Sequence, residues 1–279
     1  MKRNILTLGL ALITLLLPGQ QGAGSGDLSQ IDWQFKSVSD GVTLRYANDS
    51  LFSSVQAIYV VDVDTSAAVF EFGVAVPDSR MATSEIARQE GVLAAVNGTF
   101  FNMKEGYNVH YVRVDDSIVA VTDEGEFGIR ATGIFTATGE TADILPWGPE
   151  REDAGVVSAE DAIVSGPLLI DDGEDMPLDS INFNANRHPR TMVGITAGEH
   201  MLLVVVDGRQ PGYADGMSLF ELRALAHSLG CTDALNLDGG GSTTLVVAGE
   251  GSDGVVNRPS GKVQRPVPSI LFVRHTDDK

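Results

Sequence analysis

An aspartate followed by three consecutive glycines, Asp238 to Gly241, is the segment of this 279-residue chain whose residue types and spacing best suit chemistry. The apolar run Ala234 to Leu237, which contains Asn236, precedes the aspartate, and Ser242 follows the glycines. A glycine in a regular element costs roughly 0.5–1 kcal/mol relative to alanine, so three in a row indicate that the bare backbone is needed. A polar strand end followed by open backbone is a common way to build a site, and successive free N–H groups can bind an anion.

Basic residues and a second strand end suggest what this site would bind. Asn97 and Gly98 also follow a short apolar run. Arg190 begins one predicted strand, the sequence Asp207-Gly208-Arg209 follows the next, and Arg265 lies near the C-terminus. Arginine recognises phosphate or carboxylate through two parallel hydrogen bonds. The residues alone therefore predict an anionic substrate in a local positive patch.

Four familiar site motifs do not fit the chain. Thr244 stands where both a dinucleotide-binding fingerprint and a hydrolase nucleophile elbow require glycine. Val263 replaces the Ser or Thr of a P-loop after Gly261-Lys262. Ala67 replaces the turn glycine of a calcium loop that would begin at Asp62. The five histidines show no helical metal-ligand spacing, so the sequence leaves the presence of a metal unknown.

The elements that must position these residues are mostly strands. We expect an α+β protein with a strand-rich mixed sheet, a few flanking helices and a single domain. A capping box at Ser218 to Glu221 predicts a helix that stops at Gly230, and a shorter helix is expected over residues 84–90. Hairpin connections are expected at Asp115-Asp116 and over residues 197–200. The predicted strands are Ala57 to Val63, Val69 to Val76, Val92 to Val96, Val109 to Val114, Ile118 to Val121, Ile129 to Thr136, Ile163 to Ile170, Thr191 to Thr196, Met201 to Val206, Ala234 to Leu237, Leu245 to Ala248 and Ile270 to Val273.

The N-terminus and the charge limit the setting of the protein. Lys2 and Arg3, an apolar run and small residues predict a signal peptide over residues 1–23 and a mature domain over residues 24–279, which would be secreted or periplasmic. No further run is long enough to span a membrane after cleavage. The mature chain keeps 17 of the 19 basic residues against 38 acidic ones, a net charge near −21 that disfavours nucleic acid as a partner. Cys231 is the only cysteine, which excludes an intrachain disulfide.

The order of six motifs resembles the phosphodiester glycosidase family, over roughly residues 90 to 273. The motifs are Asn97-Gly98-x-Phe100-Phe101, Ser165-Gly166-Pro167, Arg190-Thr191-x-x-Gly194, Asp207-Gly208-Arg209, the string from Asn236 to Ser242, and Arg265-x-Val267-Pro268-Ser269. In the first motif the family commonly has a second glycine where this chain has Thr99, so the loop after Asn97 is expected to be narrower.

The resemblance implies hydrolysis of the bond between sugar C1 and oxygen in a sugar 1-phosphodiester, with a sugar like N-acetylglucosamine. On this basis Asp238 is the expected catalytic base or nucleophile. Asp207 is either a second catalytic carboxylate or a residue that orients Arg209. The expected substrate-binding residues are Asn97 and Asn236 for sugar hydroxyls, Gly98 for its open backbone, Ser242 as a phosphate donor, and Arg190, Arg209 and Arg265 with the N–H groups of Gly239, Gly240 and Gly241 for phosphate.

Two other classes of function stay open at this point. A non-catalytic envelope or exopolysaccharide protein would bind a glycan without turning it over. A metal-assisted phosphodiesterase would cut the P–O bond and would need several converging Asp, Glu or His ligands. The family reading requires no cofactor, and it leaves room for a structural divalent cation held by carboxylates elsewhere. A sugar phosphate or glycan is the expected partner in each case.

Overall fold

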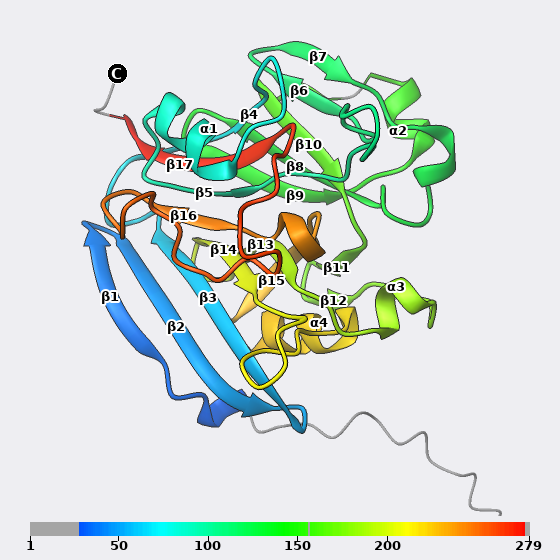
Figure 1. Cartoon of the computed structure of the whole chain (residues 1–279). Coiled ribbons are helices and arrows are strands. Elements are labelled where there is room, and N and C mark those ends of the chain that lie inside the picture. The colour runs from blue at the N-terminus through cyan, green and yellow to red at the C-terminus, as the bar shows by residue number, and fades with distance from the viewer. Residues whose placement is uncertain (1–27, 156, 277–279) are drawn as a thin grey trace, which may run out of the picture.

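Three sheets built from strands far apart in the sequence form one domain (Figure 1). The computed structural model describes residues 28–155 and 157–276, so the predicted signal peptide over residues 1–23 lies outside the described residues. Every ladder between the named strands is antiparallel. The expected α+β, strand-rich, single-domain architecture is confirmed, although three antiparallel sheets take the place of one mixed sheet.

The order of the strands across each sheet differs from their order along the chain. From one edge to the other, the eight-stranded sheet contains β1 (Gln34–Ser39), β2 (Val42–Leu51), β3 (Ser54–Asp64), β14 (His200–Val206), β13 (Arg190–Thr196), β15 (Cys231–Asn236), β11 (Leu168–Asp171) and β12 (Glu174–Asp175). The five-stranded sheet contains β7 (Ser117–Ala120), β6 (Val112–Val114), β10 (Asp161–Ser165), β8 (Gly133–Thr138) and β9 (Thr141–Pro146). The four-stranded sheet contains β16 (Leu245–Val247), β5 (Ala94–Asn97), β17 (Ile270–His275) and β4 (Phe70–Ala75).

The hairpin connections explain why the pairing is antiparallel. Asp115 and Asp116, with φ of 47° and 63°, form the tight turn between β6 and β7, as the sequence predicted. Two residues with positive φ give the turn whose twist matches the flanking strands. The expected connection over residues 197–200 joins β13 to β14. The prediction of one strand over Ile163 to Ile170 was wrong: this run is two strands in different sheets, because the chain changes direction at Gly166-Pro167.

Two helices carry the end signals that the sequence predicted. Helix α4 (Leu219–Ser228) begins at the predicted capping box, in which the Ser218 hydroxyl accepts from the Glu221 N–H at 3.2 Å. Its apolar side packs on one face of the eight-stranded sheet through Leu222 and Leu225. Helix α1 (Thr83–Glu90) matches the second predicted helix and ends at Gly91, with φ of 62°. The others are α2 (Pro149–Asp153) and α3 (Asn182–Ala185), and there are 3-10 turns η1 (Leu28–Gln30), η2 (Glu124–Glu126) and η3 (Gly240–Ser242).

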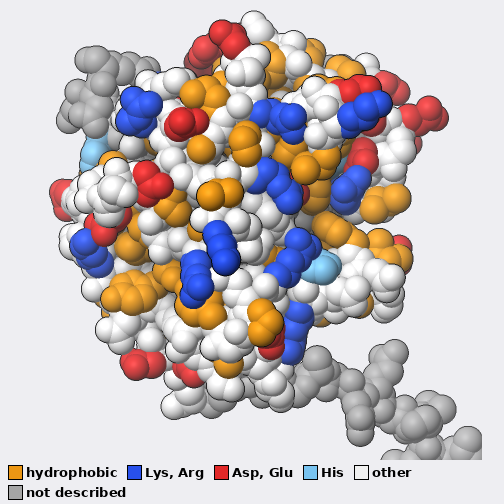
Figure 2. Space-filling view, viewed as in Figure 1, with side chains coloured by type: hydrophobic (Ala, Val, Ile, Leu, Met, Phe, Trp, Pro, Cys, Tyr) orange, Lys and Arg blue, Asp and Glu red, His pale blue; other side chains and the backbone are white. Residues whose placement is uncertain are grey.

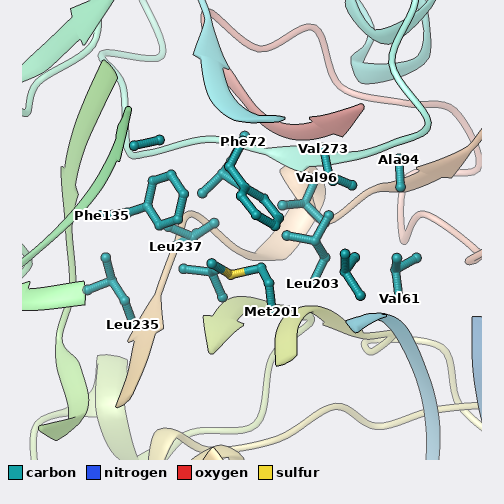
Figure 3. Packing of buried hydrophobic residues seen from close by; sticks show 14 of the residues in the cluster. Val61, Phe72, Ala94, Val96, Phe135, Met201, Leu203, Leu235, Leu237 and Val273 are labelled. Atoms are coloured by element: carbon teal, nitrogen blue, oxygen red, sulfur yellow. The ribbon is translucent and has the colours of Figure 1, made fainter. Parts of the chain in front are cut away.

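The main core lies where the three sheets face one another (Figure 3). Phe72 of β4, Phe135 of β8 and Leu203 of β14 meet there. Burial of a side chain of this size contributes about 1.5–3 kcal/mol, so the core holds the strand ends firmly. Leu237 belongs to the same cluster, which anchors the chain one residue before Asp238. Within the part of the chain that the structure describes, no helix is long and apolar enough to cross a membrane.

Candidate active site

The ends of β5 and β15 are tied together at Asp238. The Asn97 side chain donates from Nδ2 to the backbone oxygen of Asp238 at 2.6 Å, and the Asp238 N–H donates to the Gly98 oxygen at 3.2 Å. Asn97 Oδ1 accepts from the Thr191 hydroxyl at 2.8 Å and from the Thr244 N–H at 3.2 Å. Because Asn97 is fully buried and its amide serves protein groups, we correct its expected contact with sugar hydroxyls: it fixes the backbone of the aspartate.

Asn236, the last residue of β15 and two residues before Asp238, also has a structural role. It is buried, and its Nδ2 donates to the Gly166 oxygen at 2.7 Å. Its Oδ1 is also buried and has no hydrogen-bond partner among the residues described. The expected contact of Asn236 with sugar is therefore corrected as well, because a buried amide bound to a neighbouring segment is not open to substrate.

The Asp238 side chain is partly exposed to solvent, unlike the buried side chains of Asn97 and Asn236. The side chain is half-buried, and Oδ1 accepts from the Gly239 N–H at 2.8 Å. Burial raises the pKa of Asp238 to about 6, against hydrogen bonds from Ser242 and Gly239 and the charges of Arg265 and Arg130, which lower it. A carboxylate with this pKa is mostly ionised at neutral pH and still exchanges its proton within the physiological range.

The three glycines make room for two guanidinium groups and one backbone segment. A Cβ on Gly239 would lie 2.7 Å from the Pro189 oxygen. Gly240 has φ of 64°, and a Cβ there would lie 3.1 Å from Arg209 Nη1. A Cβ on Gly241 would overlap the Arg265 guanidinium. The run is thus needed because side chains of Arg209 and Arg265 lie directly against bare backbone.

Arg209 therefore packs against Gly240, and Arg265 packs against Gly241. Arg265 is half-buried and donates from Nη1 to the Ser242 hydroxyl at 3.3 Å. Arg209 is exposed and donates from Nε to His188 Nδ1 at 3.4 Å. Burial, followed by the charges of Arg209 and Arg190, lowers the pKa of His188, so its ring is neutral and can accept this bond. Two guanidinium groups against the bare backbone of one loop suit an anionic substrate better than a neutral one.

Arg190 does not join them in this way. It is 2% exposed and donates to three backbone oxygens, from Nε to Met217 at 2.8 Å and from Nη2 to Phe183 at 2.8 Å and Asn186 at 2.9 Å. Burial lowers the pKa of Arg190 to about 10, so it remains charged at neutral pH. We correct its expected role in phosphate binding, because the side chain is buried and its Nε and Nη2 donors hold the loops around α3 and the start of α4.

Replacing Arg190 by Met is expected to lower the free energy of unfolding by at least about 3 kcal/mol. Hydrogen bonds from a charged group contribute about 1.5–3 kcal/mol each, and the three carbonyls would lose their donor. Urea unfolding followed by circular dichroism measures the change. The control is Arg223→Met, which removes one backbone hydrogen bond, to Met176, and an ion pair with the exposed Asp175 and should cost less. Wild-type stability together with lost substrate binding would return Arg190 to the phosphate site.

Asp207 is also a structural residue. It is 1% exposed, and its oxygens accept from Asn257 Nδ2 at 2.8 Å, from the Arg258 N–H at 2.8 Å and from the Tyr213 hydroxyl at 3.2 Å. Burial raises its pKa to about 6. Both expected roles are corrected, because these bonds orient the segment at Asn257 and Arg258 and no contact with Arg209 is found in residues 28–155 and 157–276.

Sequence reasoning missed Arg130, which reaches the site from the segment before β8. Its guanidinium lies over the Phe100 ring, 4.8 Å from the centroid, and its charge acts on Asp238. The sequence placed Arg130 inside a predicted strand, Ile129 to Thr136, where nothing marks it as different from a surface residue. Figure 2 shows basic side chains gathered toward the middle of the face on which Figure 1 places β13, β15 and β16, with acidic ones mainly toward the rim.

No group of three His, Cys, Asp or Glu side chains in the described parts of the chain is placed to hold a metal ion.

The comparison with known proteins agrees with the resemblance that the sequence suggested. Residues 90–274 match the model of the phosphodiester glycosidase family. This chain belongs to the phosphodiester glycosidase family. Membership supports glycosidase action on phosphodiesters and confirms the family predicted from the motifs.

Relatives within and around the family show how far the likeness extends. The SPbeta prophage-derived uncharacterized protein YomE of Bacillus subtilis is 32% identical over 92 residues, which are 33% of this chain and 14% of that protein. The N-acetylglucosamine-1-phosphodiester alpha-N-acetylglucosaminidase of Mus musculus is 25% identical over 181 residues, 61% of this chain and 34% of that protein. The chain therefore matches about a third or less of each of these relatives.

The solved catalytic domain of the zebrafish N-acetylglucosamine-1-phosphodiester alpha-N-acetylglucosaminidase has the same fold. It superimposes with a TM-score of 0.66 over 88% of each chain, at 18% sequence identity. That structure is described as auto-inhibited by its pro-peptide. At this identity the likeness establishes the shared fold of the phosphodiester glycosidases, and the chemistry must be argued from the residues of this chain.

Proposed function

We propose that this phosphodiester glycosidase hydrolyses the bond between sugar C1 and the phosphate oxygen of a sugar 1-phosphodiester. The observation that carries the proposal is the half-buried Asp238 carboxylate beside the Arg265–Ser242 pair and the glycine loop. The name of the mouse relative supports N-acetylglucosamine as the sugar. The predicted signal peptide supports action outside the cytoplasm, in a secreted or periplasmic form.

The chemistry needs charge stabilisation more than a strong general acid. A phosphodiester is a weakly basic leaving group, so departure of its oxygen is helped by cations that receive the growing negative charge. Arg209 and Arg265 and the N–H groups of the glycine loop would take this role, with the Ser242 hydroxyl as a further donor. Asp238 would act at the sugar, where positive charge develops at C1, as the base that activates water or as the nucleophile.

The products of the reaction test the proposal directly. Purified protein is incubated with a simple N-acetylglucosamine 1-phosphodiester, and proton and phosphorus NMR follow the products. Free N-acetylglucosamine with the phosphate still on its other partner is the expected result. N-acetylglucosamine 1-phosphate as the product, lost on addition of a chelator, would identify a metal-assisted phosphodiesterase instead. Line broadening of the sugar without turnover would identify a glycan-binding protein.

The pH dependence of turnover follows from Asp238. A base or nucleophile must be ionised, and a pKa of about 6 means that kcat/KM should fall about tenfold per pH unit below pH 6 and level off above it. Burial also raises the pKa of Asp207 to about 6, so the residual activity of Asp238→Glu serves as the control. If the fall in kcat/KM at low pH moves to another pH in Asp238→Glu, the fall is due to ionisation of residue 238. If it stays at the same pH, it is due to Asp207.

A further inference from the structure

Arg130 is held at the edge of the site by contacts from two directions. Its guanidinium lies over Phe100, which follows Gly98 and Thr99 in the loop bonded to Asp238. On the other side, a Cβ on Gly166 would lie 2.9 Å from the Arg130 oxygen, so the two backbones touch. The backbone oxygen of Gly166 in turn accepts from Asn236, two residues before Asp238. Arg130 therefore stands between the two segments that carry the proposed catalytic carboxylate.

The orientation of Arg130 is fixed by Glu126. Arg130 donates to this carboxylate from Nε at 2.8 Å and from Nη2 at 2.5 Å, a paired arrangement that defines the plane of the guanidinium. Hydrogen bonds from His110 and then Arg130 lower the pKa of Glu126 to about 2, despite partial burial, so it is ionised at any physiological pH. Arg130 Nη1 has no hydrogen-bond partner among residues 28–155 and 157–276, and is the donor left over for a ligand.

Glu126 is held in place by a buried chain of side chains. His110 is fully buried, its Nε2 lies 3.2 Å from Glu126 Oε2 and its Nδ1 lies 2.8 Å from the Thr99 hydroxyl. An ionised carboxylate only accepts, so Nε2 carries the hydrogen and donates to Glu126, while Nδ1 shares the second hydrogen bond with the Thr99 hydroxyl. The Thr99 hydroxyl closes this chain of side chains at its buried end.

We propose that Arg130 is a third guanidinium of the substrate site, offering Nη1 to the phosphate of the substrate, and that Glu126, His110 and Thr99 are positioning residues that hold it there. This inference rests on the proposed function, because it names the group that binds the anion. A lysine could not replace the arginine, since an ammonium has no planar fork that could bind Glu126 with two donors and still direct a third toward the ligand. The Phe100 ring adds a cation–π contact that holds the guanidinium over the ring.

The first test measures binding without turnover. NMR titration with N-acetylglucosamine 1-phosphate compares wild type, Arg130→Gln and Arg130→Lys, with Arg88→Gln on the exposed side of α1 as the matched loss of charge. Both substitutions of Arg130 should weaken binding about tenfold or more, because a charged donor to phosphate is lost, and Arg88→Gln should not. Equal affinity of wild type and Arg130→Gln would overturn the inference, as would a wild-type protein that does not bind the probe.

The second test separates positioning from general damage to the fold. The carboxyl pKa of Asp238, followed by carbon-13 NMR in the unliganded protein, should rise in Arg130→Gln because a positive charge that lowers it is lost, while Ser242, Arg265 and the Gly239 N–H still act on it. Thr99→Val should weaken probe binding severalfold, and Thr99→Ser, which restores the hydroxyl, should recover part of the loss. An unchanged Asp238 pKa in Arg130→Gln, with native circular dichroism, would remove Arg130 from the site. If the sugar phosphate binds as expected but no diester is cleaved, the proposed reaction fails and the assignment of Arg130 stands.

Discussion

Replacing Asp238 by Asn is expected to lower kcat on a sugar 1-phosphodiester by about 10²–10⁴-fold, the usual contribution of a positioned acid–base group. Asn keeps an oxygen that can accept from the Gly239 N–H, as Asp238 Oδ1 does at 2.8 Å, so the glycine loop should keep its conformation. What the variant loses is the negative charge beside C1 and the ability to take a proton. Initial rates measured by release of free sugar give the effect.

A control in β15, the strand that leads to Asp238, distinguishes this loss from damage to the fold. Asp233 lies five residues before Asp238, roughly 16 Å along an extended chain, and accepts from the Asp172 N–H through Oδ1 at 3.0 Å. Asp233→Asn keeps that acceptor and should retain kcat within about twofold, as expected for a site away from the chemistry. Wild-type activity in Asp238→Asn would remove the catalytic role and favour another carboxylate, or water held by the arginines alone.

Replacing Arg265 by Ala is expected to lower kcat/KM by about 10²–10³-fold, comparable with the removal of one donor from an oxyanion site. Arg265 is half-buried, lies against the Gly241 backbone and donates to the Ser242 hydroxyl, so its position is set before substrate binds. A donor that is already in place stabilises charge on the leaving phosphate without reorganisation. Arg265→Lys should recover only part of the loss, because it keeps the charge but not the fork.

Two further variants test whether the effect of Arg265 is local. Lys262 is exposed in the same segment, and Lys262→Gln removes the same charge without a contact to the glycine loop, so kcat/KM should change by less than about threefold. Gly241→Ala should reproduce much of the Arg265→Ala loss, because the added methyl group would displace the guanidinium while leaving its charge in the protein. A large effect of Lys262→Gln with little effect of Gly241→Ala would mean that only the overall positive field matters.

Much of the fold could be predicted from local pattern because the elements carry their own signals. Helix α4 has a capping box at one end and a glycine after the other, and the Asp115-Asp116 turn has the residue types that accept positive φ. β1 and β2 were missed. β1 is mostly exposed and shows no clear apolar period, and β2 alternates only over Val42, Leu44 and Tyr46 before the polar residues 48–50 interrupt the pattern. The assignment of strands to three sheets depends on contacts between distant segments that no local pattern contains.

The sequence by itself determined the family and the glycine run with its aspartate, and it led to the hypothesis of an anionic substrate. These follow from residue types that few other structures need in that order, as three glycines against the guanidiniums of Arg209 and Arg265 now explain. Only the tertiary structure decided which polar side chains face the site. Asn97, Asn236 and Arg190 could have bound substrate with the same donors that they give to backbone oxygens. Buried backbone groups at strand ends must be paired, and sequence spacing does not show whether a nearby amide or guanidinium will pair with them or with a ligand.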